Sequence, residues 1–379
     1  MRIPYVDLGL QHSNLLEEIN LVISKVISSG SFILGEQVRI FEENISKRIG
    51  CKYAIGVNSG TDALILSLLA LGIRKGDEVI TVPNSFLATV AAIELIGAKA
   101  VLVDVCDDQN IDVKKIRNKI TPKTKAIIPV HLTGRPSSMS EILEIAKEFN
   151  IKVIEDCSQA FDAEYMGKKV GSLGDVGAFS LHPLKNLGAC GDAGVVVTDQ
   201  KEVADYIRLI RNHGLINRDE CVQWGYNSRL DEIQAAILNV KLKYLDKWNN
   251  RKREIAKMYF DGLENTPIRL PIETEDRTNV YHAFVIKTDL QRELKEYLES
   301  KSIEVKIHYP IPIHKQTASQ HNDFYVEEFK IAEKQSGEIL SLPIYPELTN
   351  DQVNEIIFEI NSFFNNSKYN LVSDHNLYI

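Results

Sequence analysis

Cysteine is scarce and unfavourably spaced in this sequence. The five cysteines, Cys51, Cys106, Cys157, Cys190 and Cys221, contain no CxxC pair, and their number is odd. This arrangement fits neither a disulfide framework nor a zinc site built from paired cysteines. We therefore expect reduced thiols, as in a protein of the cytoplasm.

Long apolar runs and an excess of basic residues are also missing. The most apolar stretch, residues 90–105, is interrupted by Glu94, Gly97 and Lys99, whereas a membrane span needs roughly 18 uninterrupted apolar residues. Lysine and arginine total 44 against 52 acidic residues, so the net charge is −8. Nucleic-acid-binding proteins usually carry a basic surface. We expect a cytoplasmic protein that binds neither membrane nor nucleic acid.

What the sequence does contain is a long alternation of two patterns. Short runs rich in Val and Ile occupy residues 53–57, 78–82, 100–105, 126–130, 152–156, 176–180 and 194–198. Segments of helical periodicity precede or separate them, at residues 14–29, 36–49, 61–72, 86–96 and 138–149. Buried strands that alternate with helices predict an α/β fold with a mixed, mostly parallel sheet of seven strands.

The pattern changes after a helical segment at residues 231–245. We expect strands at residues 281–287 and 304–309 and helices at 289–300 and 350–363. This indicates a large domain of residues 1–247 and a smaller α+β domain of residues 248–379. The Asn-rich tail from Asn365 is expected to be mobile.

Small and polar residues follow four of the predicted strands. They are residues 58–63 (NSGTDA), 83–86 (PNSF), 131–134 (HLTG) and 156–159 (DCSQ). In open α/β sheets, ligands bind beyond the carboxyl ends of the strands. The NSGT turn could bind an anion at a helix N-terminus or could simply cap that helix through Ser59 or Thr61. Residues 188–194 (GACGDAG) lack the dinucleotide-binding spacing and lead into a strand, so a nicotinamide cofactor is disfavoured.

Two charged motifs could carry chemistry. Glu155 and Asp156 end a strand and point to opposite faces, so we expect at most one in the cleft; two solvated acids are the ordinary alternative. Lys185 lies in a tight loop between two predicted strands. Burial lowers the pKa of a lysine, and a neutral amine can form a Schiff base, although most lysines are surface charges. The histidines lack metal-binding spacing, so no metal is predicted.

Four strings in this order resemble one known family. They are SGTDAL (59–64), EDCSQA (155–160), FSLHPLKNLGACGDAG (179–194) and GYNSRLDEIQAAIL (225–238). The sequence resembles the DegT/DnrJ/EryC1/StrS family of pyridoxal-phosphate-dependent sugar aminotransferases, from about residue 4 to about residue 348. The resemblance implies fold type I, the aspartate-aminotransferase fold, and a homodimer that shares its active sites.

The resemblance also implies roles for individual residues. Lys185 would hold the cofactor as a Schiff base and move protons, and Asp156 would keep the pyridine nitrogen protonated. Phe86 would stack on the ring, and Gln159 would lie near its oxygen. The phosphate would be bound by Gly60, Thr61 and Ser180, and by Asn227 of the other subunit.

The implied reaction is a two-stage amino transfer. L-glutamate would leave the amino group on the cofactor as pyridoxamine phosphate, and a keto-sugar, expected to be nucleotide-linked, would accept it during amino-sugar biosynthesis. A nucleotide-free acceptor such as an 8-oxo-octulosonate is the alternative. Family members that dehydrate sugars have His in place of Lys185, and a regulator without activity would have lost Lys185 or Asp156. Both residues are present.

An anionic sugar nucleotide needs local cations or donors, because the chain as a whole is acidic. The segments expected to flank the site supply candidates for substrate contacts: His182, Arg211, His213, Arg229, His308, Tyr309 and His314. Ordinary surface side chains are the alternative for each. Arg229 could instead order the loop beside Asn227.

Overall fold

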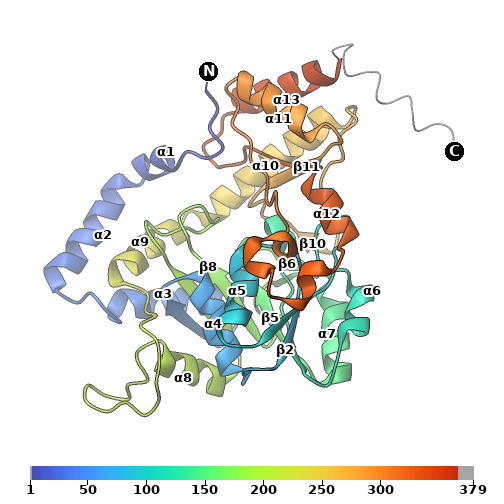
Figure 1. Cartoon of the computed structure of the whole chain (residues 1–379). Helices are drawn as coiled ribbons and strands as arrows, with labels where there is room; N and C mark the ends of the chain where they lie inside the picture. The colour runs from blue at the N-terminus through green and yellow to red at the C-terminus, as the bar shows by residue number, and fades with distance from the viewer. Residues whose placement is uncertain (1, 366–379) are drawn as a thin grey trace.

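The computed structural model describes residues 2–365, so the predicted mobile tail beyond Asn365 lies outside the described residues. The chain begins with three helices along one side of the molecule (Figure 1): α1 (Leu8–Ser13), α2 (Leu16–Ser29) and α3 (Glu36–Ile49). Glycines in the left-handed conformation end α2 at Gly30 and α3 at Gly50, where a side chain would be strained.

A central sheet follows, and within residues 2–365 it has seven strands in the order β1-β9-β8-β5-β4-β2-β3. The strands are β1 (Tyr53–Val57), β2 (Glu78–Thr81), β3 (Lys99–Leu102), β4 (Thr124–Ile127), β5 (Lys152–Asp156), β8 (Val176–Ser180) and β9 (Gly194–Thr198). β9 runs antiparallel to β1 and β8, and the other pairings are parallel. The predicted mostly parallel sheet of seven strands is confirmed. The sequence could indicate it because strands that are buried on both faces appear as continuous apolar runs.

Helices cover the sheet. They are α4 (Gly60–Ala70), α5 (Leu87–Leu95), α6 (Val113–Ile116), α7 (Met139–Phe149), α8 (Lys201–Ile210) and α9 (Glu232–Leu242). α4 is apolar all round and buried between α5 and the sheet, which suits a central helix. Ser59 caps α4: its Oγ accepts a hydrogen bond from Asp62 N over 3.1 Å. No helix among residues 2–365 is both long and apolar enough to cross a membrane.

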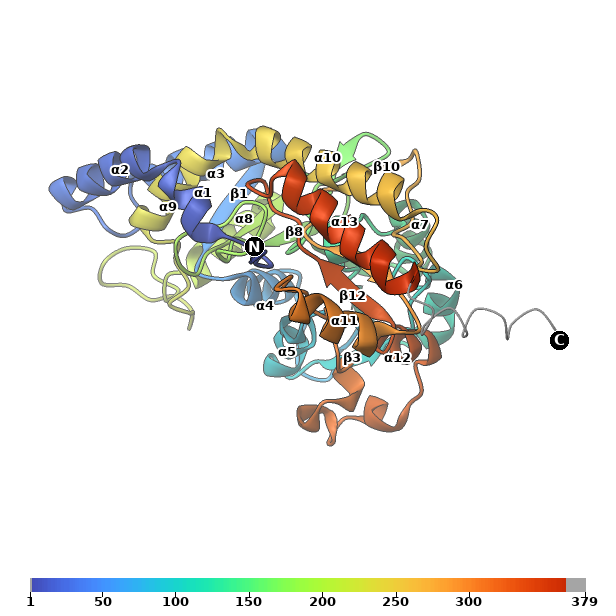
Figure 2. The same cartoon turned by 90° about the horizontal axis from the view of Figure 1, so that it is seen from above.

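Much of the chain after α9 forms a second hydrophobic core. The long helix α10 (Leu245–Leu263) leads to it, and α13 (Asn350–Asn365) lies alongside α10 in Figure 2. The 3-10 turns at Ile313–Lys315, Thr317–Ser319 and Asp323–Val326 and the helix α12 (Lys330–Ser336) pack instead against the core of the central sheet, through Ile313, Phe324 and Ala332. β11 (Phe284–Lys287), β12 (Ile339–Leu342) and α11 (Gln291–Ser300) belong to the second core. Ile3 packs into this core and residue 248 lies inside α10, so the division after residue 247 stays a prediction.

The predicted strand at residues 304–309 is wrong. Within this segment, which the structure describes in full, the only pairing with β12 is an isolated bridge from Lys306 to Ser341. Pro310 and Pro312 follow and have no N–H to donate, so a ladder cannot continue. The chain instead turns away and carries Tyr309 towards the end of the central sheet.

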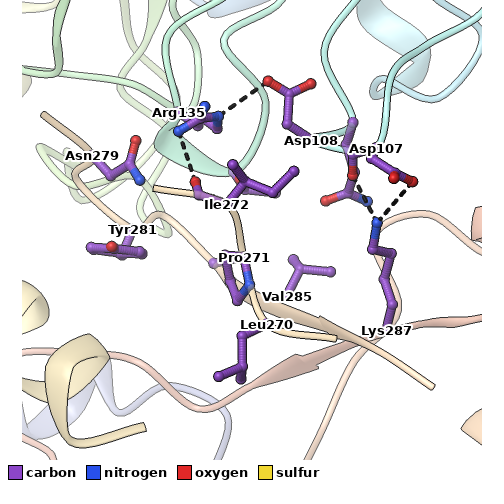
Figure 3. A pocket seen from close by; sticks show the side chains of 13 residues that line it. Asp107, Asp108, Arg135, Leu270, Pro271, Ile272, Asn279, Tyr281, Val285 and Lys287 are labelled. Carbon is purple, nitrogen blue, oxygen red and sulfur yellow. Dashed lines mark hydrogen bonds and ion pairs between the residues drawn. The ribbon is translucent and has the colours of Figure 1, made fainter. Parts of the chain in front are cut away.

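Ion pairs and hydrogen bonds join the central sheet to the second core around a small pocket (Figure 3). Arg135 Nε donates to Asp108 Oδ2 over 3.2 Å, and Arg135 Nη1 donates to the carbonyl of Ile272 over 2.7 Å. Lys287 Nζ donates to the carbonyl of Asp107 over 2.8 Å. A separate small sheet of β6 (Glu164–Tyr165), β7 (Lys168–Lys169) and β10 (Arg277–Thr278) also links the two parts.

Candidate active site

Asp156 ends β5 and is buried at the carboxyl edge of the central sheet. Thr89 Oγ1 donates to its Oδ2 over 2.8 Å, and the N–H of Ser158 donates to its Oδ1 over 3.1 Å. Each oxygen therefore has one donor and keeps a free lone pair. The carboxylate is oriented but can still accept a hydrogen bond from a ligand.

Glu155 is buried as well, so the alternative that both acids are merely solvated does not hold. Its oxygens accept backbone N–H groups from Gly171, Leu173 and Gly174, and they contact His131 Nε2 at 3.0 Å. His131 Nδ1 accepts the N–H of Ser137, which places the ring proton on Nε2 and towards Glu155.

This network also explains a cluster of possible metal ligands. His131, Glu155 and Cys157 are all buried, with ligand atoms within 4.8 Å of one another. The hydrogen bonds above already engage both ring nitrogens of His131 and both oxygens of Glu155. Burial raises the pKa of the Cys157 thiol well above its usual range, which opposes the thiolate that a metal needs. The cluster is therefore a hydrogen-bonded support for the end of β5.

Lys185 lies in the loop between β8 and β9. The loop is tight: the N–H of Lys185 donates to the carbonyl of His182 over 2.8 Å, and a Cβ on Gly188 would lie 2.5 Å from the carbonyl oxygen of Pro183. Burial lowers the pKa of Lys185 to about 8, and the nearby Asp156 carboxylate opposes this shift. A larger fraction of neutral, nucleophilic amine is present near neutral pH than an exposed lysine would have.

The NSGT turn lies against β8 and β9. A Cβ on Gly60 would lie 2.5 Å from Ser180 Cβ, and a Cβ on Gly194 would lie 2.3 Å from the carbonyl oxygen of Ser59. Glycine is thus required at both positions by close backbone approach. The first N–H groups of α4, at Gly60 and Thr61, have no acceptor within the helix and carry its positive end. Together with the Ser180 hydroxyl, they form a corner suited to an anion.

An aromatic and an amide complete this edge of the sheet. Gln159 accepts the N–H of Thr133 through Oε1 over 2.7 Å and donates through Nε2 to the Tyr309 hydroxyl over 3.1 Å. The ring of Phe86 lies 5.8 Å from that of Tyr309 and is 54% exposed. An exposed aromatic ring beside a buried carboxylate offers a flat surface for a heteroaromatic ring.

Two of the predicted substrate residues, His182 and His308, lie near Lys185. His308 lines a cavity with Lys185, and burial lowers its pKa to about 4, with the Lys185 charge adding to the shift. The imidazole of His308 is therefore neutral, and its Nδ1 contacts Ser341 Oγ at 2.9 Å. His182 lies at the surface beside Lys185. The protein covers part of its ring, and this partial burial lowers its pKa, with a smaller contribution from the Lys185 charge.

The other candidates lie elsewhere. Arg211 is buried and donates to Glu42 Oε1 and the carbonyl of Gly56, so its charge is already paired. His314 is buried against Glu333, 2.8 Å from its Oε1. We therefore do not retain Arg211 or His314 as substrate contacts. The sequence shows neither partner, because Glu42 and Glu333 lie far from or outside the recognised motifs and only the folded packing brings them into contact.

The segment that begins at Arg211 projects from the body of the molecule (Figure 1). It carries His213 and Asn227, both exposed, and backbone hydrogen bonds close its base. Arg229 Nη1 donates to Asn212 Oδ1 over 3.3 Å, consistent with the expectation that Arg229 orders this loop.

Sequence reasoning missed several residues at the site. Thr89, which binds Asp156, has no signal beyond its place in the first turn of α5. Asn249 and Lys252 line the cavity with Lys185. A signal for Lys252 existed: it falls on the helical stripe of Trp248, Ile255 and Tyr259, where a buried apolar residue is expected.

Comparisons with known proteins agree with this geometry. The family model described as "DegT/DnrJ/EryC1/StrS aminotransferase family" matches residues 14–361. The chain belongs to this family. The recognition made from the four sequence strings is thereby confirmed, and the protein is a pyridoxal-phosphate-dependent aminotransferase of fold type I.

Individual members of the family are similar over almost their whole length. The chain is 44% identical over 362 residues to a dTDP-3-amino-3,6-dideoxy-alpha-D-galactopyranose transaminase of Aneurinibacillus thermoaerophilus, covering 95% of this chain and 99% of that protein. It is 40% identical to a pleiotropic regulatory protein of Geobacillus stearothermophilus, covering 96% and 99%. The solved structure of S. venezuelae DesV in complex with a ketimine intermediate superposes with a TM-score of 0.93 at 37% identity, covering 96% and 98%.

Proposed function

We propose that this aminotransferase moves the amino group of L-glutamate to a keto-sugar carried on a nucleotide, in the synthesis of an amino sugar. The relatives support a nucleotide-linked acceptor, since one is named for a dTDP-linked amino sugar and another, from Acidithiobacillus ferrooxidans, for a UDP-linked one. The observation that carries the proposal is the approach of Lys185, with its lowered pKa, to the oriented carboxylate of Asp156.

The residues present fit pyridoxal phosphate. The corner of Gly60, Thr61 and Ser180 would hold its phosphate, Phe86 would cover one face of its ring, and Gln159 would lie near the ring oxygen. Asp156 would hold a proton at the ring nitrogen through its free lone pairs. When bound, the cofactor supplies an electron sink that makes a proton on the substrate's reacting carbon removable.

Lys185 would perform the proton transfers. Its Nζ is held near the end of β5 by the tight loop, and burial keeps a fraction of it neutral near pH 8. A neutral amine can take a proton from the reacting carbon of the donor and deliver it two atoms away, beyond the nitrogen, which is the 1,3-proton shift that amino transfer requires. It can reverse these steps with the sugar. His308 beside it is neutral and so adds no positive charge that would further disfavour the protonated form of Lys185.

We further propose that the protein works as a homodimer with shared sites. The projecting segment exposes Ile216, Val222 and Trp224, the last with 91% of its surface accessible. Large exposed apolar side chains on one segment commonly mark a protein contact. The same segment bears Asn227, so a second copy that covers it would receive Asn227 near its own Ser180.

The two half-reactions test the function separately. Cofactor-loaded protein should lose its visible absorbance when L-glutamate is added and regain it with a suitable sugar. Mass spectrometry with isotopically labelled glutamate should find the label in the product of a dTDP- or UDP-linked keto-sugar. Labelling only a nucleotide-free sugar would reject the nucleotide-linked acceptor, and no spectral change with glutamate would reject the donor. A protein without either half-reaction would favour a regulatory role.

A further inference from the structure

A cavity adjoins Lys185 on the side that faces α10. It is lined by α10, by residues 5–8 of the N-terminal segment and by residues 344–347. Its volume of about 80 Å³ exceeds what one ordered water requires. Three polar side chains on its wall, Asn249, Lys252 and His282, have few or no partners, although each is surrounded by protein.

The hydrogen-bond pattern fixes the orientation of Asn249. Asn186 must donate through Nδ2 to the carbonyl of Val280, at 2.8 Å, because a carbonyl can only accept. The same Nδ2 donates to Asn249 Oδ1 over 2.8 Å. The remaining amide nitrogen of Asn249, Nδ2, therefore has no hydrogen-bond partner on this wall of the cavity. The residue is only 1% exposed, so water does not readily satisfy this donor.

Lys252 adds a nearly unpaired cation to the same wall. It is 7% exposed, and its single polar contact among the described residues is a long one, 3.5 Å from Nζ to Asn186 Oδ1. Burial lowers the pKa of Lys252 to about 8, with the more distant Glu347 opposing the shift. The adjacent His282 has no partner for Nδ1, and burial holds its pKa well below the usual range.

Acidic side chains also line the cavity but do not neutralise these donors. Asp7 and Glu347 lie on the wall formed by the N-terminal segment and residues 344–347. Burial raises the pKa of Glu347, as expected for a carboxyl group without a close cationic partner. The wall next to Lys185 is thus rich in donors, and unsatisfied buried donors are costly unless an acceptor fills the space.

We propose that Asn249 and Lys252 form a subsite for a carboxylate of the amino donor. The inference rests on the proposed function for the identity of the donor. In an α-amino acid, the carboxylate is attached to the carbon that reacts, so it must lie close to Lys185 when the amine does. A phosphate of a sugar nucleotide is separated from the reacting sugar carbon by the ring, and therefore fits this cavity less well.

Two substitutions test the subsite in the cofactor-loaded protein. Lys252→Met removes the charge, and Asn249→Asp keeps the oxygen that accepts from Asn186 but replaces the unpaired amide by an acceptor. Each should raise the KM for L-glutamate about tenfold or more, as expected for losing a hydrogen bond to a charged group. The rate at saturating glutamate and the rate of the sugar half-reaction should both change much less than this KM. Lys257→Met is the matched control, since Lys257 lies on the exposed side of α10 and pairs with Asp261.

Binding of glutarate, which has two carboxylates and no amine, provides a readout without turnover. Calorimetry should show binding to the wild-type protein and to Lys257→Met, and about tenfold weaker binding to both cavity variants. Unchanged glutarate binding in both variants, or a defect confined to the sugar half-reaction, would overturn the subsite. A wild-type protein that binds glutarate but does not react with glutamate would instead reject the proposed donor and still support the carboxylate subsite.

Discussion

Thr89 Oγ1 donates a hydrogen bond to Asp156 Oδ2 over 2.8 Å and so joins the first turn of α5 to the end of β5. Phe86 is the N-cap residue of the same helix. One helical turn therefore positions both the exposed aromatic ring and the carboxylate expected to bind the ring nitrogen of the cofactor. A shift of α5 would move the two groups together, because residues three apart lie on one face of a helix.

Thr89→Val should impair this arrangement without unfolding the protein. The substitution keeps the shape of the side chain but removes the donor to Asp156, so kcat should fall about tenfold or more, as expected for losing one hydrogen bond to a charged group. Steady-state kinetics and cofactor absorbance measure this loss. Thr89→Ser, which keeps a hydroxyl donor, should retain most of the wild-type activity. Equal activity of the Val and wild-type proteins would show that Thr89 does not orient Asp156.

Mixing two inactive variants should restore activity if the sites are shared. Lys185→Ala lacks the amine, and Asn227→Ala lacks the contact proposed to come from the other subunit. A mixed dimer contains one site with neither residue and one site with both. Random pairing in a two-fold dimer makes about half of the dimers mixed, and one of the two sites in each mixed dimer is complete. Co-refolded mixtures should therefore reach about a quarter of the wild-type activity. No recovery, with mixed dimers verified by mass spectrometry, would place Asn227 outside a shared site.

Lys252 should make stability depend on alkaline pH. Its pKa is about 8 in the folded protein and about 10.4 when unfolded. The unfolded chain therefore binds more protons between these values, so the free energy of unfolding should rise with pH from about 8 to about 10. Lys252→Met should reduce this slope by up to about 1.4 kcal/mol per pH unit.

Urea denaturation of the cofactor-free protein at several pH values measures this slope. Using cofactor-free protein leaves the Lys185 amine free in every sample. Lys257→Met, which removes an exposed lysine of the same helix, should retain the wild-type slope. The same slope in Lys252→Met and wild type would mean that Lys252 is not desolvated.

Glu155→Ala should destabilise the protein strongly. The carboxylate accepts three backbone N–H groups, from Gly171, Leu173 and Gly174. Each buried N–H left without an acceptor costs about 1–3 kcal/mol, so the free energy of unfolding should fall by more than about 3 kcal/mol. Chemical denaturation measures this loss. The exposed Glu202→Ala should change it little, and a similar small effect at Glu155 would contradict the supporting role.

Much of the central architecture was predictable because its signals are local. The Val- and Ile-rich run at residues 152–156 is a strand in any parallel sheet that buries both faces, and Asp156 at its end was placed at the ligand edge. Residues 304–309 carried a similar local signal, yet the segment leaves the sheet after one bridge. A strand depends on a neighbour to pair with, and the local sequence does not reveal that neighbour.

The sequence by itself determined the seven strands of the central sheet, the helices that alternate with them, and the family, because short strings and periodicity carry these features. The tertiary structure alone decided which polar groups are paired. It buried Arg211 against Glu42 and left Lys252 and Asn249 facing a cavity beside Lys185. The reason is physical: a charge is satisfied or left unpaired by atoms that lie far away in the sequence, and folding alone brings those atoms within hydrogen-bond distance.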